Sequence, residues 1–276
     1  NFKAENDAVI PSTRGYYAYA LFLDLIRQAN PTVAEKLHDL EGPKPFTLSP
    51  LQGKLRGERG SIRLATDDIY WMRLTFLQED VFANFLDAAL KASDRVLHLN
   101  QALLRIHEIK TTPGASHMCR FETFEELVLS AGVGRQLRFE FLSPTAFRSG
   151  GKRNVLLPEP RLVFTGYFVK WQSLSPIKLP DNLLALADKG LRLTQHKMET
   201  RMLNFGSYQE AGFEGRCTIE IAEELPEEAV RSFNALASFA FYCGTGAKTT
   251  MGMGQTRRLD DVRSVPGGAR GYSPQG

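Results

Sequence analysis

The sequence has few of the residues that would indicate a secreted or metal-dependent protein. Its 276 residues include three cysteines, Cys119, Cys217 and Cys243, which are odd in number and far apart. This spacing offers neither a disulfide framework nor a metal motif, because a zinc site needs about four ligands. The cysteines therefore predict a reduced, cytoplasmic compartment, and the sequence predicts no metal and no cofactor.

Long apolar segments and a strong charge are also missing. No run approaches the roughly 20 apolar residues of a membrane-spanning helix, and no secretory signal is visible, so we expect no membrane partner. The net charge is +3, which permits an anionic partner without requiring one. A nucleic-acid site must therefore come from local clustering. Hydrophobic residues make up 43% and charged residues 24% of the chain, as in globular domains with a sizeable core.

What the sequence does contain is a glycine-rich stretch near its end, Gly244-Thr-Gly-Ala-Lys-Thr-Thr-Met-Gly-Met-Gly-Gln255. Glycines allow close backbone approach, and N–H groups beside Lys248, Thr249 and Thr250 suit a phosphate oxygen. A solvated turn is the alternative. The stretch follows a predicted helix and precedes a predicted strand, the reverse of a nucleotide phosphate loop or a dinucleotide fingerprint. A nucleotide-hydrolysing fold is thereby excluded.

Hydrophobic periodicity predicts two similar halves. The first half contains an initial strand, helices 15–29 and 31–39, strand-like runs 46–51 and 68–76, helix 78–92 and strand 101–110. The second half contains strand 137–142, helix 160–173, hairpin arms 191–205 and 216–221, helix 226–243 and strand 252–259. Each half follows the order β-α-β-β-α-β, which predicts an α+β fold of tandem ferredoxin-like (RRM-like) domains. We place the domains at 1–128 and 129–262, with a disordered tail at 263–276.

Four different segments lie at a characteristic spacing along this predicted order of elements. They are Gly15-Tyr-Tyr-Ala-Tyr-Ala-Leu-Phe-Leu-Asp-Leu-Ile26 with its continuation to His38, Gly42-Pro-Lys-Pro-Phe-Thr-Leu-Ser49, Phe141-Leu-Ser-Pro-Thr-Ala-Phe147 and the glycine-rich stretch. Together they resemble the CRISPR repeat-processing endoribonucleases, which cut precursor CRISPR RNA within its repeats. The resemblance implies a metal-independent enzyme that drives the ribose 2′-OH onto the adjacent phosphorus, leaving a 2′,3′-cyclic phosphate and a 5′-OH.

The resemblance also implies catalytic residues. His38 matches the catalytic histidine, and Lys44 matches a lysine that neutralises the scissile phosphate. A third position, often a tyrosine, is Leu23 here, and Tyr19 one helical turn earlier is the candidate to replace it. The chemistry agrees, because an imidazole can move protons at neutral pH and a lysine stabilises charge that grows on phosphate. The alternative is that His38 caps its helix and Lys44 is simply solvated.

RNA contacts are expected at the glycine-rich stretch, at a basic cluster near the first strand of the second half, and in the predicted hairpin. A basic cluster can hold a phosphate backbone with salt-sensitive affinity, although a solvated charged loop is the alternative. The candidates are Gly244, Gly246, Lys248, Thr249, Gly252 and Gly254 in the stretch, Arg135, Arg138, Arg148, Lys152 and Arg153 in the cluster, and His196 in the hairpin.

The expected partner is CRISPR repeat RNA, both as precursor and as mature guide. Membership of a multisubunit CRISPR effector complex and formation of a homodimer are left open. One alternative function is a non-catalytic RNA-binding subunit of such a complex, which Leu23 favours. Another is a paired-RRM binder of single-stranded RNA, which is weakened because the predicted central strands lack the aromatic pairs that stack bases.

Overall fold

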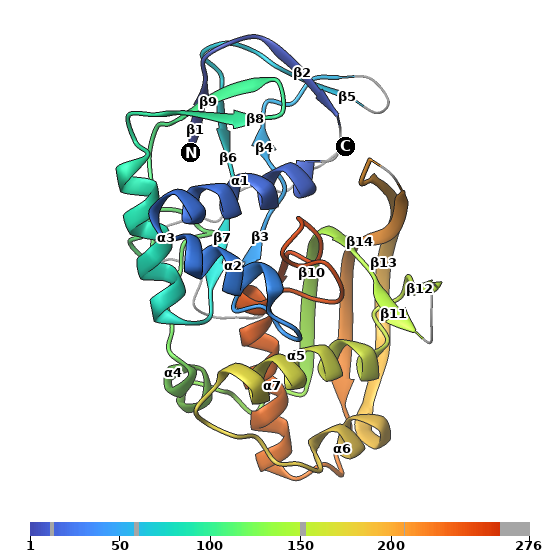
Figure 1. The fold of residues 1–276 in the computed structure, drawn as a ribbon. Helices are drawn as coiled ribbons and strands as arrows, with labels where there is room; N and C mark the ends of the chain where they lie inside the picture. Colours follow the sequence, from blue (N-terminus) through green and yellow to red (C-terminus); the bar gives the residue numbers. More distant parts are fainter. Residues whose placement is uncertain (12–13, 58–60, 150–152, 207, 260–276) are drawn as a thin grey trace.

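The computed structural model describes residues 1–11, 14–57, 61–149, 153–206 and 208–259 (Figure 1). These residues form an α+β protein of two halves, each with helices packed on an antiparallel sheet. The fold predicted from the sequence is confirmed. The expected tail at 263–276 lies outside the described residues.

The first half is a ferredoxin-like unit with extra strands. Its sheet has the order β4-β6-β1-β9-β8, and each neighbouring pair is antiparallel. The order β4-β6-β1-β9 places the second, third, first and fourth strands of a β-α-β-β-α-β unit side by side. The strands are β1 (Phe2–Ala4), β4 (Gln52–Gly53), β6 (Ile69–Trp71), β8 (Val96–Leu99) and β9 (Ala102–Ile106), and the helices are α1 (Arg14–Ala29), α2 (Pro31–Asp39) and α3 (Glu79–Lys91).

Short strand pairs make this half less regular than the sequence predicts. The expected strand 68–76 is divided at Met72 and Arg73 into β6 and β7 (Leu74–Phe76), and β7 leaves the sheet to pair with β3 (Phe46–Leu48). A separate pair, β2 (Ala8–Pro11) with β5 (Ser61–Leu64), was not predicted. Runs of three or four residues are too short for periodicity to define, so only tertiary pairing identifies them.

The second half has the same topology with longer strands. Its sheet order, β13-β14-β10-β15, is again second, third, first, fourth, with antiparallel neighbours. The hairpin is longer than predicted, because β14 begins at Gln209. The strands are β10 (Gln136–Thr145), β13 (Leu191–Asn204), β14 (Gln209–Ile221) and β15 (Thr256–Arg258), with the small pair β11 (Phe147–Ser149) and β12 (Arg153–Val155); the helices are α4 (Phe124–Leu129), α5 (Pro160–Leu174), α6 (Leu183–Gly190) and α7 (Glu227–Cys243).

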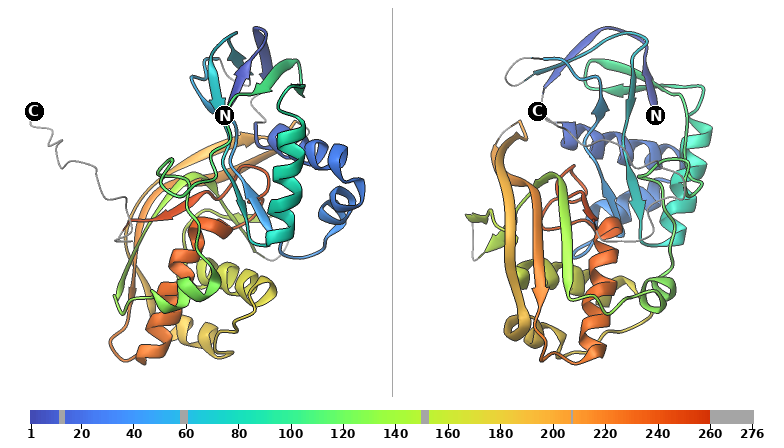
Figure 2. Two further views of the ribbon diagram at one scale, coloured as in Figure 1. Left: turned by 90° about the vertical axis from the view of Figure 1, so that its left-hand side faces the viewer. Right: turned by 180° about the vertical axis from the view of Figure 1, so that it is seen from behind.

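The helices of both halves lie on the same side of the molecule. Figure 2, left, shows α5, α6 and α7 against one face of the second sheet, whose other face looks away from them. Helices α1, α2 and α3 lie on the side where α5 and α6 are found. The molecule therefore has a helical side, which carries α2, and a side formed by the free face of the second sheet.

The end of α7 joins the two halves through buried hydrogen bonds. Thr75 Oγ1 donates to the Tyr242 carbonyl over 2.6 Å. Arg73 donates to the Phe241 carbonyl over 2.9 Å and to Gln255 Oε1 over 3.1 Å, and its guanidinium lies 3.9 Å from the centre of the Phe241 ring. Arg73 is 7% exposed. A buried, charged donor with this many partners fixes the relative orientation of the halves.

Replacing Arg73 with methionine is expected to lower the free energy of unfolding by about 3 kcal/mol. The buried oxygen atoms that accept hydrogen bonds from Arg73 would lose their charged donor. Urea unfolding followed by circular dichroism measures this loss. Arg27→Met is the matched control, since the Arg27 side chain is 57% exposed. Equal stability of the two variants would contradict the structural role of Arg73.

Candidate active site

The two predicted catalytic residues lie at the C-terminal end of α2. His38 is exposed in the last turn. Lys44, in the loop that follows, folds back so that its ammonium donates to the carbonyls of Leu37 (2.8 Å), His38 (2.9 Å) and Leu40 (2.6 Å). An ammonium has three N–H donors, and all three are used here. Lys44 therefore caps the helix, whereas the alternative drawn from the sequence gave that role to His38.

This cap holds the main chain at His38 while leaving its imidazole exposed. Burial lowers the pKa of Lys44, and the charge of Asp39 opposes that effect. A direct bond from Lys44 to a phosphate requires the exchange of one of its three carbonyl partners. The positive charge still acts through space on an anion beside His38, because Coulomb attraction needs no contact.

Tyr19 and Leu23 lie on the side of α1 that packs toward α2. They are 9% and 5% exposed, and both belong to the apolar cluster that includes Leu37. The Tyr19 ring stacks on Phe46 with 6.4 Å between ring centres. Burial raises the pKa of Tyr19, so its phenol keeps its proton at neutral pH and can donate a hydrogen bond. The structure thus places Tyr19, the candidate for the third position, and Leu23 beside the helix that carries His38.

The glycine-rich stretch forms a folded loop between α7 and β15. A Cβ atom at Gly246 would lie 2.4 Å from the Ala146 carbonyl oxygen, and one at Gly254 would lie 2.0 Å from that of Thr245. Side chains other than hydrogen are therefore excluded at both positions. The loop glycines also have positive φ, which glycine adopts without steric cost; the angles are 63° at Gly244, 75° at Gly246, 86° at Gly252 and 71° at Gly254.

The loop also touches the first half of the chain. A Cβ at Gly15, in the first turn of α1, would lie 1.9 Å from the Met251 carbonyl oxygen, and one at Gly252 would lie 3.0 Å from the Gly15 Cα. Leu48 of β3 donates its N–H to the Thr249 carbonyl over 3.0 Å. Met251 packs against the apolar cluster beneath α2. The loop therefore lies next to the elements that carry His38 and Tyr19, as Figure 1 also shows.

Several backbone N–H groups of this loop form no hydrogen bond with the part of the chain that the structure describes. Loop N–H groups that do form hydrogen bonds, such as those of Thr245 and Ala247, point to the carbonyls of Gly254 and Ala146. Others have no hydrogen-bond partner among the residues that the structure describes. Such donors, grouped in a loop with left-handed residues, are suited to an anion. They are the N–H groups of Gly246, Lys248, Thr249, Thr250 and Gly252.

Lys248 ties the loop to the tip of the β13–β14 hairpin. Its Nζ lies 2.6 Å from Glu210 Oε1, donates to the Tyr208 hydroxyl, and lies 4.2 Å and 4.1 Å from the ring centres of Phe205 and Tyr208. Burial would raise the pKa of Glu210, but hydrogen bonds and the charges of Lys248 and Arg148 lower it. The side chain of Lys248 is therefore an anchor for the loop, and it shares the negative charge of Glu210 with Arg148.

The basic residues expected to cluster lie in separate places. Arg135, just before β10, donates to two carbonyls in the β14–α7 connection, and Arg138 lies on the exposed face of β10. Arg148 pairs with Glu210 at 2.7 Å beyond the other end of β10, about 30 Å of extended chain away. Lys152 lies outside the described residues, as does the side chain of Arg153. RNA contact by these residues stays a prediction.

Three basic residues that were not among the sequence candidates share a sheet face with Arg138. They are Lys197, Arg216 and Arg257, on β13, β14 and β15. Alternation along each strand predicts which residues share its face, but the register between strands is set by tertiary pairing. His196 is exposed on the opposite side of β13, level with Cys217.

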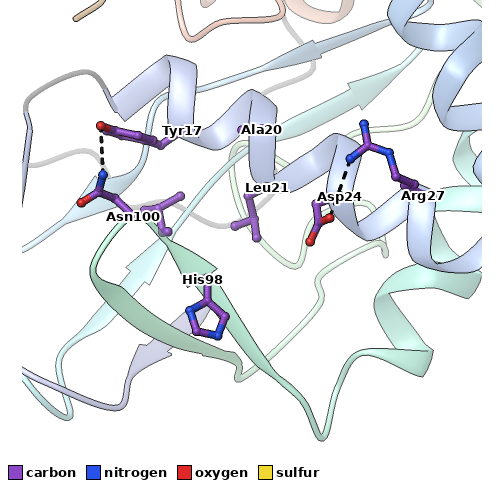
Figure 3. A pocket seen from close by; sticks show the side chains of 8 residues that line it. Tyr17, Ala20, Leu21, Asp24, Arg27, His98 and Asn100 are labelled. Carbon is purple, nitrogen blue, oxygen red and sulfur yellow. Dashed lines mark hydrogen bonds and ion pairs between the residues drawn. The ribbon is translucent and has the colours of Figure 1, made fainter.

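A pocket of about 290 Å³ lies on the other flank of α1 (Figure 3). Asn100 donates to the Tyr17 hydroxyl over 3.1 Å at one end, and Asp24 lies 3.9 Å from Arg27 at the other. His98 stands on the facing β8 strand. The polar groups largely satisfy one another, and Tyr19 and Leu23 face away from this flank. The pocket is therefore separate from the site at His38.

The loop contacts predict an unequal effect of two glycine substitutions. Gly246→Ala combines a positive φ with a clash against a carbonyl, so we expect a loss of more than about 2 kcal/mol in unfolding free energy. Gly206→Ala is the control, since its φ is 87° but no atom lies within 4 Å of the new Cβ. It should lose only about 1 kcal/mol. Urea unfolding of both variants checks this, and equal losses would contradict a close-packed loop.

Two general findings concern the whole described chain. Over residues 1–259, apart from the gaps given above, none of the helices has the length and apolar character to cross a membrane. Within the same residues, no group of three or more His, Cys, Asp or Glu side chains is arranged to hold a metal ion.

Comparison with protein families matches both halves of the chain. The CRISPR Cas6 N-terminal domain matches residues 4–128, and the CRISPR-associated endoribonuclease Cas6 domain matches residues 139–256. The CRISPR-associated endoribonuclease Cas6 of Mycobacterium tuberculosis (strain CDC 1551 / Oshkosh) is 32% identical over 124 residues, which span 45% of this chain but only 38% of that relative. The Streptococcus thermophilus protein of the same name is 24% identical over 234 residues, 83% of this chain and 86% of that relative.

Solved structures extend the likeness over nearly the whole chain. A Cas6 product complex, of a Thermus thermophilus protein, is 30% identical with a TM-score of 0.79, and the match covers 94% of this chain and 98% of that one. A second Cas6 product complex has a TM-score of 0.75 at 24% identity, with 94% and 98% covered; at that identity it shows the shared fold. The chain therefore belongs to the Cas6 family of CRISPR-associated endoribonucleases.

Proposed function

We propose that this protein cuts precursor CRISPR RNA within its repeats, without a metal ion, and leaves a 2′,3′-cyclic phosphate and a 5′-OH. The observation that carries the proposal is the exposed His38 at the capped end of α2. A glycine-rich loop packs against α1 and β3, and several of its backbone N–H groups have no partner among the described residues. Membership of the Cas6 family and the likeness to a Cas6 product complex support the same activity.

The reaction needs two proton transfers and stabilisation of charge. The 2′-oxygen loses its proton and attacks phosphorus, the bond to the 5′-oxygen breaks, and that oxygen takes up a proton. The His38 imidazole can serve as the base or, when protonated, as the acid. Lys44 provides positive charge beside the phosphate, where negative charge grows in the transition state. Tyr19 is assigned as the third member, as a hydrogen-bond donor.

The glycine-rich loop is assigned to docking of the RNA backbone. Its N–H groups without a partner among the described residues suit phosphate oxygens, and they do not depend on the Lys248 side chain, which is paired with Glu210. Because the loop is packed against Gly15 and β3, a phosphate bound there has a set position relative to α2. Docking and chemistry are therefore assigned to different parts of the chain.

The competing function is binding of RNA without cleavage, which Leu23 favours. Incubation of repeat RNA with the protein in EDTA separates the two. A product that ends in a cyclic phosphate excludes the binding-only function and a metal-dependent mechanism together. Intact RNA, bound but not cut, would refute the proposed activity.

His38→Ala is expected to reduce the single-turnover cleavage rate by roughly 10²–10⁴-fold, since it removes a proton-transfer group. The dissociation constant for repeat RNA should change little, because the imidazole is one group in an extended interface. His98→Ala, at the exposed histidine of the separate pocket, is the matched control and should cut at the normal rate. Normal cleavage by His38→Ala would refute the assignment.

Lys44→Met is expected to affect both stability and rate. The carbonyls at the end of α2 lose their cap, which lowers the unfolding free energy by about 1–2 kcal/mol, and the phosphate loses a nearby charge. Lys44→Arg should recover more of the rate than Lys44→Met, measured at a temperature where both are folded. Lys36→Met, at an exposed lysine of the same helix, is the control. If Lys44→Met is less stable but cuts normally, Lys44 has only the capping role.

A further inference from the structure

The free face of the second sheet carries a row of charged residues that crosses all four strands. The register aligns Lys197 with Arg216, Arg216 with Glu140, and Glu140 with Arg257. Arg138, two residues before Glu140, points to the same side and is exposed. These side chains face outward because they alternate with buried core residues such as Phe139. With neighbouring strands about 4.8 Å apart, the row is about 14 Å long.

Glu140 holds two arginines of this row in place, and the row keeps a net positive charge. Its carboxylate lies 2.6 Å from Arg216 and 2.5 Å from Arg257, and its own side chain is 12% exposed. Burial would raise the pKa of Glu140, but hydrogen bonds and the charges of the two arginines lower it, so the acid stays ionised. The arginine side chains remain 64% and 34% exposed. Four cations and one anion give the patch a charge of +3.

The positive patch has an acidic border on one side. There, Glu199 lies opposite Glu214, and Arg201 bridges the two at 2.8 Å and 3.7 Å. On the other side, Glu220 lies between Gln136 and the basic Arg192, so that border carries no net charge. An anion is therefore attracted to the row and repelled from the Glu199–Glu214 side of it. The side chains of the row are polar throughout, so the patch has no apolar or aromatic anchor of the kind that dominates protein–protein interfaces.

We propose that this patch, made of Arg138, Lys197, Arg216 and Arg257, is a second RNA contact that binds the phosphate backbone away from the cut bond. The inference rests on the proposed function only in taking RNA as the ligand. The patch faces away from α5, α6 and α7, whereas α2 lies on the helical side (Figure 2). The scissile phosphate at His38 and a phosphate on the patch are thus different parts of the transcript. Contacts to phosphate alone add affinity without reading sequence.

The test compares two double variants that remove the same charge. Lys197→Gln with Arg216→Gln removes two cations of the patch, and Lys91→Gln with Lys189→Gln removes two exposed lysines from helices. Both are made in the His38→Ala background, so that RNA is not cut during the measurement. Dissociation constants are measured against salt for a full repeat with its flanks and for a short RNA limited to a few nucleotides around the cut bond.

For the full repeat, the logarithm of the association constant falls with the logarithm of the salt concentration, and this fall should be less steep for the patch variant. Two lost phosphate contacts, at about 0.7 each in single-stranded RNA, reduce the steepness of the slope by about 1.4. For the short RNA, the patch and control variants should have the same slope. Equal slopes for both variants on the full repeat overturn the proposal, and so does an equal loss on the short RNA. Failure of the parent protein to bind either RNA would instead refute the proposed function. Unchanged thermal unfolding confirms that both variants are folded.

Discussion

The buried contact between the two halves is the constraint on which the site depends. The last turn of α7, the end of the glycine-rich loop and the β3–β7 pair meet there, joined by Arg73, Thr75 and Gln255. These groups are buried, so each hydrogen bond that is broken leaves a polar atom without water. The halves therefore cannot shift independently at low cost. A loop from one half is held beside a helix of the other, which neither half could achieve alone.

This arrangement separates the groups that hold the backbone from the group that moves protons. His38 stands exposed at a helix end whose carbonyls are satisfied by Lys44. In the glycine-rich loop, several N–H groups have no partner within the described part of the chain, and the Lys248 side chain ties the loop to the β13–β14 hairpin. Rigid support of this kind suits proton transfer, in which misplacement of the reacting atoms is costly. The same hairpin contributes Lys197 and Arg216 to the free face of the sheet.

Much of the fold followed from the sequence, since long helices and alternating strands have periods that are visible in one dimension. Helices α1, α2, α3, α5 and α7 were predicted with near-correct bounds, and both halves have the predicted topology. The short helices α4 and α6 were missed, as were the short strands β2, β4, β5, β8, β11 and β12, and 68–76 was treated as one strand. Such segments are defined by their partners: β7, for example, pairs with β3 at the contact between the halves.

The candidate site was also predicted only in part from the sequence. The sequence alone determined the residue types and their order: His38 at the end of a helix, Lys44 beyond a proline-containing turn, and a loop rich in glycine. Only the tertiary structure decided that Lys44 caps α2, that Lys248 is paired with Glu210, and that Arg135 and Arg148 lie apart. The physical reason is that a lysine or arginine binds whichever acceptor the fold brings near. That acceptor belongs to another strand or turn, and the sequence around the lysine or arginine does not show how close that acceptor lies in the folded chain.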